Sequence, residues 1–420
     1  MVEKDTRKIN LVLLFIMAMA GNLPLLAQNT SATLGPVFLS LGHDSNFFTG
    51  EETLKDSVLL IEPTTLEIAR ASARSELIFA YRPEFELFNS HPELNAWNHE
   101  GQLRFDYRIS RRSSFRAGAA AAVTQDPARR SAGSLFIMPR GDYKAAGAYA
   151  AFSRHLNRRT TLDARVDNSI TRVSLPEALM SGLLDQMSNG ATVTLSRALA
   201  PRHNISAGYS FVKPALLHRD SEGTEETEAL FQPAHNLILS YGYSAAHGLS
   251  THVSTGVMHN IRPAYLLSGQ VEKRSRAWRT GLTYSRHLSL LGGLGPGTPD
   301  LASTEPLRGL LGNTLVQSVT LSLGATVASK LAVEITARGS KTSSESLEQD
   351  FHSVWGKAHL DYRLTDRIVA FLNFEVYGQE VNALLGPSLS RTRSSGGVRV
   401  ALGRGDRTVF RSDELNTALH

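Results

Sequence analysis

Apolar and polar residues alternate with a period of two along most of the chain. Between Trp97 and Ile109, every odd position except 99 and 101 is a large apolar or aromatic residue, and every even position is Asn, Glu, Gln, Arg or Asp. Successive side chains of a β-strand point to opposite faces, so this stretch predicts a strand with one apolar and one charged face. The same split recurs at 76–87, 161–170, 318–327 and 353–363. No comparably long helical periodicity appears after residue 27.

The links between these predicted strands alternate in length. Short links join strands in pairs, at 110–112, 157–158, 245–247, 273–275, 329–330 and 365–366. Longer polar or Gly/Pro-rich segments separate the pairs, at 125–142, 174–188, 214–230, 291–312, 340–350 and 379–390. Tight turns at one end and long loops at the other are typical of outer-membrane barrels, whose short turns face the periplasm.

Counting the predicted strands gives about eighteen, with sixteen as the alternative. Their centres fall near Leu39, 60–68, Phe79, Phe105, Ala119, Tyr149, Val166, Val193, Tyr209, Leu239, Val253, Leu267, Leu282, Leu321, Val333, Leu360, Leu372 and Val400. The alternation is weakest in the first strand, at 36–41, in the second, which Pro63 splits, and in the last. The predicted fold is all-β, a transmembrane antiparallel up-and-down β-barrel.

The N-terminus has the pattern of a secretory signal peptide. Lys4, Arg7 and Lys8 precede an apolar run at 9–20, and Ala27 is a small residue at the expected cleavage site. An uncleaved anchor is the alternative, but the run is short for a membrane span and Pro24 breaks its end. This pattern predicts export.

The chain therefore divides into four predicted parts: a signal peptide at 1–27, an N-terminal segment with the first strand at 28–56, the barrel at 57–403, and a strand end with a tail at 404–420. No segment after the signal peptide is apolar for long enough to cross a membrane as a helix. An exported chain of this kind is either soluble outside the cytoplasm or spans a membrane as a closed barrel.

Composition removes several classes of protein. The chain has no Cys, which excludes disulfide frameworks and cysteine-based zinc or redox sites. Its 44 Lys and Arg nearly balance 39 Asp and Glu, and a net charge of +5 over 420 residues does not indicate nucleic-acid binding. No G-x-S-x-G elbow, H-E-x-x-H pair or P-loop is present, so no catalytic residue, cofactor or metal is predicted.

The charged face of the strands is the predicted lumen of the barrel. Ionised groups are costly in lipid, so they must line water or pair with each other. The candidates are Glu76, Arg82, Glu84, Glu100, Arg104, Asp106, Arg108, Asp163, Arg165, Asp167, Lys357, Asp361 and Arg363. Mixed charge predicts a channel without strong ion selectivity that suits neutral polar solutes and small ions. A salt-bridge network that only holds the wall together is the competing interpretation.

Aromatic residues fall mostly on the apolar face, close to strand ends. The tyrosines assigned to that face are Tyr81, Tyr107, Tyr149, Tyr209, Tyr241, Tyr243, Tyr284 and Tyr362. Tyr has an apolar ring and a polar hydroxyl, so these positions predict a girdle at the membrane interface. Core packing in a soluble sheet is the alternative, but no dry core would accept the charges of the opposite face.

Two long loops leave their roles open. The glycine-rich segment 291–312 either folds inward as a constriction or covers the mouth of the barrel. The acidic segment 214–230 is an ordinary solvated loop or a site for divalent cations that bridge lipopolysaccharide.

Three stretches carry a resemblance to known proteins. The sequences LGHDSNFF at 41–48, YRPEF at 81–85 and NAWNH at 95–99, followed by the Arg/Asp strand, resemble the β-barrel porin and outer-membrane β-barrel families of Gram-negative bacteria. Members of these families occur beside exopolysaccharide-export genes. The resemblance is specific over about 40–125. It implies a pore-forming or polysaccharide-secretion-associated barrel and supplies no catalytic residues. For a barrel in the outer membrane, the expected partners are membrane lipid, lipopolysaccharide and the barrel-insertion machinery.

One feature departs from that resemblance. Many such barrels end on an aromatic residue, whereas this chain runs ten residues past Phe410 to His420. The position of the last strand is therefore open.

Two functions follow from the sequence. The first is a porin-like channel or conduit for small polar solutes or exported polysaccharide. The second is a structural or adhesive barrel with a plugged lumen that acts through its extracellular loops. A secreted soluble β-protein is a third reading. The solute, the pore state, self-association and any specific partner are left open, and no nucleic-acid partner is expected.

Overall fold

The computed structural model describes eleven segments of the chain: 30–45, 55–125, 142–174, 186–219, 225–228, 233–245, 247–259, 263–289, 314–344, 349–380 and 389–402. The predicted signal peptide at 1–27, the glycine-rich segment at 291–312 and the tail at 404–420 lie outside these residues. Of the acidic segment at 214–230, parts of the backbone are described.

Nearly all of the described residues are in β-strands. The strands are β1 (Thr30–Leu34), β2 (Val37–Asp44), β3 (Asp56–Glu62), β4 (Leu66–Ala71), β5 (Ser75–Phe88), β6 (Ala96–Arg108), β7 (Ser113–Thr124), β8 (Asp142–His155), β9 (Thr160–Ser174), β10 (Gln186–Ala200), β11 (His203–Arg219), β12 (Glu225–Glu228), β13 (Ala234–Ser244), β14 (Leu249–His259), β15 (Pro263–Arg274), β16 (Trp278–Ser289), β17 (Thr314–Ala328), β18 (Leu331–Ser344), β19 (Gln349–Arg363), β20 (Ile368–Glu380) and β21 (Leu389–Val400). One short 3₁₀ helix, η3 (Pro92–Leu94), follows β5. No helix in the described segments is long and apolar enough to cross a membrane.

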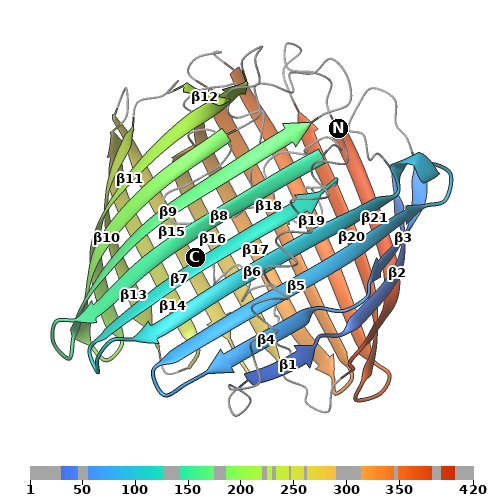
Figure 1. Ribbon diagram of the computed structural model, residues 1–420, viewed down its shortest axis with the longest axis horizontal. Helices are drawn as coiled ribbons and strands as arrows, with labels where there is room; N and C mark the ends of the chain where they lie inside the picture. Colours follow the sequence, from blue (N-terminus) through green and yellow to red (C-terminus); the bar gives the residue numbers. More distant parts are fainter. Residues whose placement is uncertain are drawn as a thin grey trace.

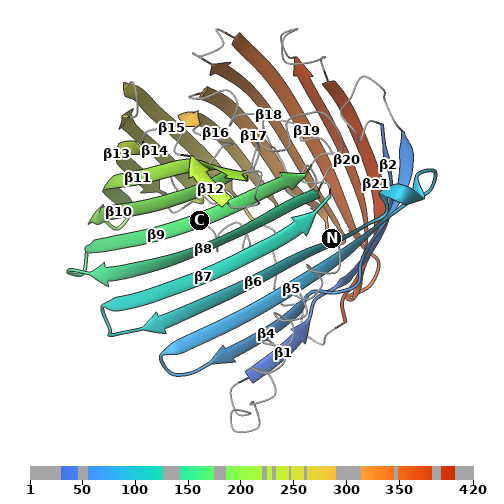
Figure 2. The ribbon, with the colours of Figure 1, turned by 45° about the horizontal axis from the view of Figure 1, so that its top comes forward.

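The strands form one antiparallel sheet that closes on itself as a barrel (Figure 1). Neighbouring strands pair in chain order from β5 to β21, apart from the short β12, which adds to the end of β11. Closure is made by β2, which pairs with β21 on one side and with β3 on the other. In Figure 2, β5–β9 form the near wall and β16–β19 the far wall.

Eighteen strand positions surround the barrel, which confirms the predicted count over the alternative of sixteen. The first two positions are each occupied by a strand that is broken in two. β1 and β2 form the first position, with a break at Gly35–Pro36, and β3 and β4 form the second, with a break at 63–65. β1 pairs with β4, and β2 pairs with β3. Pro has no N–H to give to a ladder, so it interrupts the pairing. The two interrupted segments are hydrogen-bonded to each other. Gly35 N donates to Thr65 O (2.7 Å), and Thr64 Oγ1 donates to Gly35 O (2.9 Å).

The last strand lies earlier in the chain than its predicted centre. Val400 is the final residue of β21 and not its middle, so that position was wrong. The reason is the composition of the outward face of β21, where Ser390, Thr392, Ser394 and Gly396 give no apolar alternation to detect. The link predicted at 340–350 is also shorter than expected, because β18 continues to Ser344 and β19 starts at Gln349.

The eight short links lie at one end of the barrel, which we call the turn end. They span 72–74, 109–112, 156–159, 201–202, 245–248, 275–277, 329–330 and 364–367. They carry nine exposed Lys or Arg side chains, Arg74, Arg111, Arg112, Arg158, Arg159, Arg202, Arg276, Lys330 and Arg367, and one acidic residue, Asp366. We call the opposite end the loop end. Of the sequence separations between strands that are joined at the loop end, 260–262 and 345–348 are the shortest, and the others are longer.

The strand register divides the wall into two faces all the way round. Following the paired residues from Glu86 through β6 to β21 and back by β2 and β3 returns to Glu86 on the same face. The apolar parity is exposed, with Leu237, Leu321 and Leu372 at 64%, 55% and 60% of their full accessibility. The fully buried Glu86, Asn98 and Asn236 lie on the other parity. The polar parity therefore faces the interior.

Candidate functional site

The interior wall of the barrel contains all of the charged residues predicted to line a lumen. The register places each of them on the inward parity: Glu76, Arg82, Glu84, Glu100, Arg104, Asp106, Arg108, Asp163, Arg165, Asp167, Lys357, Asp361 and Arg363. The structure joins Arg82 to Glu100 and Arg104 to Glu76 across neighbouring strands. Asp106 and Asp361 pair across strands with Arg116 and Arg399, which were not among the candidates. That they border a conducting path stays a prediction.

Strands β5, β6 and β7 carry the longest run of inward charges. Asp106 lies at its centre and forms ion pairs with Arg104 Nε (2.9 Å) and Arg116 Nε (2.6 Å). Arg104 also lies 3.4 Å from Glu76. Glu76 and Asp106 are directly opposite each other in the register, and Arg104 and Arg116 supply the opposite charge beside them. Each partly water-exposed pair is worth about 0.2–1 kcal/mol. The run supports the wall, as the salt-bridge interpretation expects, but it does not show that the lumen is closed.

Tyr149 is on the opposite face from the one predicted. The register pairs it with Gly118 on β7 and with Asp167 on β9, both inward positions, and its side chain is 8% exposed. The guanidinium of Arg165 lies 4.5 Å from its ring centre. Strand β8 reads Ala-Ala-Gly-Ala-Tyr-Ala-Ala-Phe, with apolar residues on both parities. Because both odd and even positions of β8 are apolar, the alternation could not show which face Tyr149 occupies.

Gly118 is the position that lets Tyr149 lie flat against the wall. A Cβ added there would lie 2.5 Å from the ring atom Cε1. We expect Gly118→Val to displace the ring and to destabilise the barrel by about 1–3 kcal/mol, the usual range for overpacking. Urea unfolding in detergent micelles measures this. The double variant Gly118→Val/Tyr149→Ala should recover part of the loss, and an equal loss in both variants would show that the ring is not the cause.

Two carboxylates share one amide near the loop end of the interior. Asn98 Nδ2 donates to Glu84 Oε1 and to Glu86 Oε1, each at 2.8 Å. Asn98 Oδ1 accepts from the backbone N–H of Gln125 at 3.0 Å, which ties the end of β7 to β6. Glu86 and Asn98 are fully buried. This cluster therefore links β5, β6 and the end of β7 at the loop end of the wall.

A second buried cluster joins the first and last strands. Arg391 on β21 donates to Asp44 on β2 through Nε (3.0 Å) and Nη2 (2.5 Å), and Arg393 Nε lies 2.9 Å from the same carboxylate. Asp44 and Arg391 are 6% and 4% exposed. We call these three residues the seam cluster. The sequence analysis missed it because its members are 347 residues apart. The i, i+2 spacing of Arg391 and Arg393 on one strand face was the signal available.

The interior wall is chemically two-sided, which the sequence analysis also missed. On β10–β17 the inward positions are mainly Ser, Thr and Gly, for example Thr192, Thr194, Ser206, Ser210, Ser240, Ser254, Ser268, Thr283, Ser285, Ser318, Thr320 and Ser322. We call this surface the hydroxyl arc. Among the described inward side chains of the arc, charges occur near the turn end alone, at Glu272, Arg274 and Arg279.

The hydroxyl arc is linked across its strands by short hydrogen bonds. The hydroxyls of Ser254 and Ser268 are 2.5 Å apart, and those of Ser285 and Ser318 are 2.8 Å apart. These small groups leave room inside the wall and present both donors and acceptors. The rest of the wall, from β18 through β21 and β2 to β9, carries most of the ion pairs in the described segments, and the arc contributes Arg274 with Glu272 and Arg279 with Glu334. The interior can therefore hydrogen-bond neutral polar groups on one side and meet charges of both signs on the other.

The outward face carries aromatic side chains at two levels. Toward the loop end, the ring of Phe85 stacks on Trp97 at 5.2 Å, and the Tyr81 hydroxyl hydrogen-bonds His99 Nδ1 at 2.6 Å. Toward the turn end, the outward residues include Tyr107, Tyr241, Trp278 and Tyr362, which are 38–44% exposed. Of the eight tyrosines assigned to this face, all but Tyr149 are there. The two levels bracket an apolar band, as at the two interfaces of a bilayer.

No group of three or more His, Asp or Glu side chains in the described segments is arranged to hold a metal ion. The absence of a catalytic residue, a cofactor and a metal stays a prediction.

Comparisons with known proteins find structures with a similar course of the chain. No family model and no curated protein matches the sequence. A BenF-like porin from Pseudomonas fluorescens Pf-5 is 8% identical, with a TM-score of 0.49, over 89% of this chain and 99% of that chain. OccK5 (OpdH) from Pseudomonas aeruginosa is 9% identical, with a TM-score of 0.49, over 90% and 99%.

Iron transporters match over a smaller share of their length. The FrpB iron transporter from Neisseria meningitidis is 8% identical, with a TM-score of 0.48, over 85% of this chain. The chain spans 64% of FrpB and 60% of the ferric citrate transporter FecA, less than two thirds of each. At these identities and TM-scores, function has to be argued from this chain's own residues.

Proposed function

We propose that the protein is an outer-membrane β-barrel that forms a channel for small polar solutes. The observation that carries this proposal is the division of the wall into two faces, which holds through every strand pairing of the closed ring. Exposed apolar surface of this extent is stable in lipid and not in water. The ionised side chains on the other face would be costly in lipid and are accepted in a hydrated interior.

The hydroxyl arc and the mixed charges define the class of solute. Facing hydroxyls and amides exchange hydrogen bonds with a neutral polar solute in place of water. Both signs of charge are present on the opposite wall, so neither cations nor anions are strongly favoured. We infer that sugars and other small uncharged polar molecules are the best-matched solutes.

An exported polysaccharide is a second candidate cargo. The hydroxyl arc supports it, because the arc continues along most of the length of β10–β17 and would meet successive sugar units of an extended chain. We also propose that residues 1–27 direct secretion of the protein and are then removed.

N-terminal sequencing of the protein from purified outer membranes should therefore begin at Gln28.

Conductance tests the channel directly. Purified full-length protein in a planar bilayer should give stepwise currents with little preference between K⁺ and Cl⁻, and proteoliposomes should swell in small sugars. Thr194→Trp adds bulk on the inward face and should lower the single-channel current. Val193→Trp, one residue away on the outward face, is the matched control and should leave it unchanged. Persistent silence of folded wild-type protein would contradict the channel and support a plugged, adhesive or structural barrel.

A further inference from the structure

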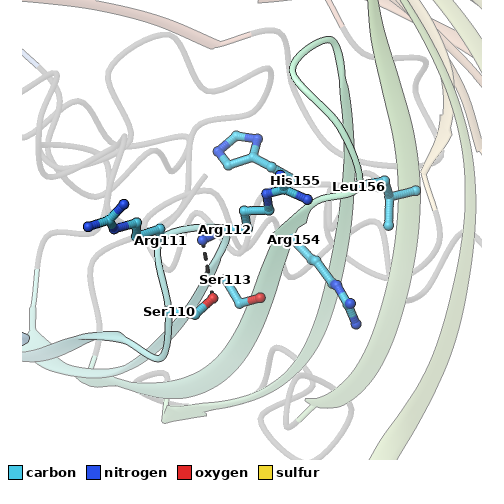
Figure 3. Close-up of a pocket in the computed structure, with 7 residues that line it drawn as sticks. All are labelled: Ser110, Arg111, Arg112, Ser113, Arg154, His155 and Leu156. Carbon is cyan, nitrogen blue, oxygen red and sulfur yellow. Dashed lines mark hydrogen bonds between the residues drawn. The ribbon is translucent and has the colours of Figure 1, made fainter.

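The turn end of the barrel carries a cavity of about 350 Å³ between two neighbouring links, 109–112 and 156–159 (Figure 3). Its lining includes Arg111, Arg112, Arg154 and His155, together with the hydroxyls of Ser110 and Ser113. No acidic residue lines it. We call it the turn cavity. Cationic groups, hydroxyls and exposed backbone N–H groups are the donors that bind phosphate oxygens.

The backbone around the turn cavity is fixed by hydrogen bonds. Ser110 N donates to Ser113 O at 3.0 Å, and His155 N donates to Arg112 O at 2.8 Å, so the two links are joined directly. Ser110 Oγ accepts from Arg112 N at 3.1 Å, as Figure 3 shows. In the same view Arg111 and Arg154 extend in different directions from the cavity. The frame is therefore ordered while the guanidinium groups stay exposed.

The guanidinium groups of the turn cavity have no charge partner in the described part of the chain. None of Arg111, Arg112 and Arg154 forms an ion pair there. The surrounding rim does not neutralise them either, because the eight short links hold nine Lys or Arg and one acidic residue. On the lumen wall, by contrast, Arg82, Arg116 and Arg391 are each paired with a carboxylate.

The height of the turn cavity matches the headgroup layer of a bilayer. Tyr107 and Phe115 face each other across β6 and β7 on the outward face, at the aromatic level. Arg154 is also outward and is in register with Ser113, two residues beyond Phe115. Two residues of strand span about 7 Å, and the polar layer on each side of the hydrocarbon is roughly 5–7 Å thick. Ile109 and Leu156, in the two links, are exposed apolar residues at 45% and 46% of their full accessibility.

We propose that the turn cavity binds the phosphate group of an anionic phospholipid in the leaflet next to the short turns. Its headgroup would lie between Arg112 and Arg154, and its chains would run along the outward face below Tyr107. The proposal rests on the membrane-spanning part of the proposed function and not on conduction. A barrel that is silent in bilayers would still bind this lipid.

Lipid titration followed by native mass spectrometry tests the proposal. Full-length protein in zwitterionic detergent is titrated with phosphatidylglycerol and, separately, with phosphatidylcholine. We expect one phosphatidylglycerol to be retained at concentrations at which phosphatidylcholine is lost. Arg112→Gln/Arg154→Gln should weaken that binding about 25-fold, taking about fivefold for each basic group near an anionic headgroup. The control Arg202→Gln/Lys330→Gln removes two cations from other links and should weaken it much less.

Three outcomes would overturn the proposal. Equal retention of the two lipids would show that charge is not recognised, and equal losses in the two double variants would show diffuse attraction without a site. Displacement of the lipid by an equal concentration of inorganic phosphate would leave a simple anion site. Heat-modifiable migration on gels checks that each variant is folded. If the double variant does not fold, Arg112→Gln alone should still weaken binding about fivefold.

Discussion

Replacing Val193 by Arg is expected to destabilise the folded barrel by about 2–4 kcal/mol, the cost of a basic residue on the lipid face near the bilayer midplane. Val193 lies at the middle of β10, on the outward parity, and is 47% exposed. The guanidinium would have to leave water for hydrocarbon, with few partners in reach. Reversible unfolding in guanidinium chloride from phosphatidylcholine vesicles measures the change in free energy.

Thr194→Arg is the matched control, one residue further along the same strand. Thr194 is inward and directly opposite Asp163 on β9, so the new guanidinium meets water and a carboxylate. We expect a change within about 1 kcal/mol, as for a water-exposed pair. If Thr194→Arg were the more damaging of the two, the two faces would be reversed, and the membrane location would fall with them.

The fold could be predicted from the sequence because its main signal is local. In a barrel wall each strand meets lipid on one side and water on the other. Apolar and polar residues therefore alternate along the sequence of the strand itself. Strand β6 shows this at its clearest, with Leu103 and Phe105 alternating with Arg104 and Asp106. This alternation in most of the strands, together with the turns between them, was enough to predict the strand count without any information on pairing.

Errors arose where a strand lacks that contrast. β8 is apolar on both faces, and Tyr149 was therefore assigned outward, whereas the glycine opposite it, Gly118, provides its space inside. β21 is polar on both faces over its first half, and its centre was placed too late. In each case the side chain's environment is decided by a neighbouring strand and not by the sequence of the strand itself.

The interior chemistry was predicted in part. The charged candidates were found because ionised residues stand out in an alternating pattern. The hydroxyl arc was not found, because Ser, Thr and Gly on an inward face look like ordinary polar positions until the register aligns them over β10–β17. The seam cluster depends on contacts between the two ends of the strand array, which no local pattern encodes.

The seam cluster is expected to determine how firmly the barrel closes. Asp44 receives hydrogen bonds from Arg391 and Arg393, and both it and Arg391 are almost completely buried. Removing one member of a buried, hydrogen-bonded ion pair leaves the other charge uncompensated, which costs about 3–5 kcal/mol. We expect Asp44→Leu to lose stability in this range, measured by urea unfolding in micelles.

The partner variants separate the ion pair from simple packing. Arg391→Met should cost less than Asp44→Leu, because Arg393 remains beside the carboxylate at 2.9 Å. The double variant Asp44→Leu/Arg391→Met should be more stable than Asp44→Leu alone, since the buried cation that caused the loss is gone. Strictly additive losses would contradict the coupling. Because β2 and β21 pair over eight residues, from Val37 with Val400 to Asp44 with Arg393, a weakened seam should also speed hydrogen exchange in these two strands before the rest of the wall.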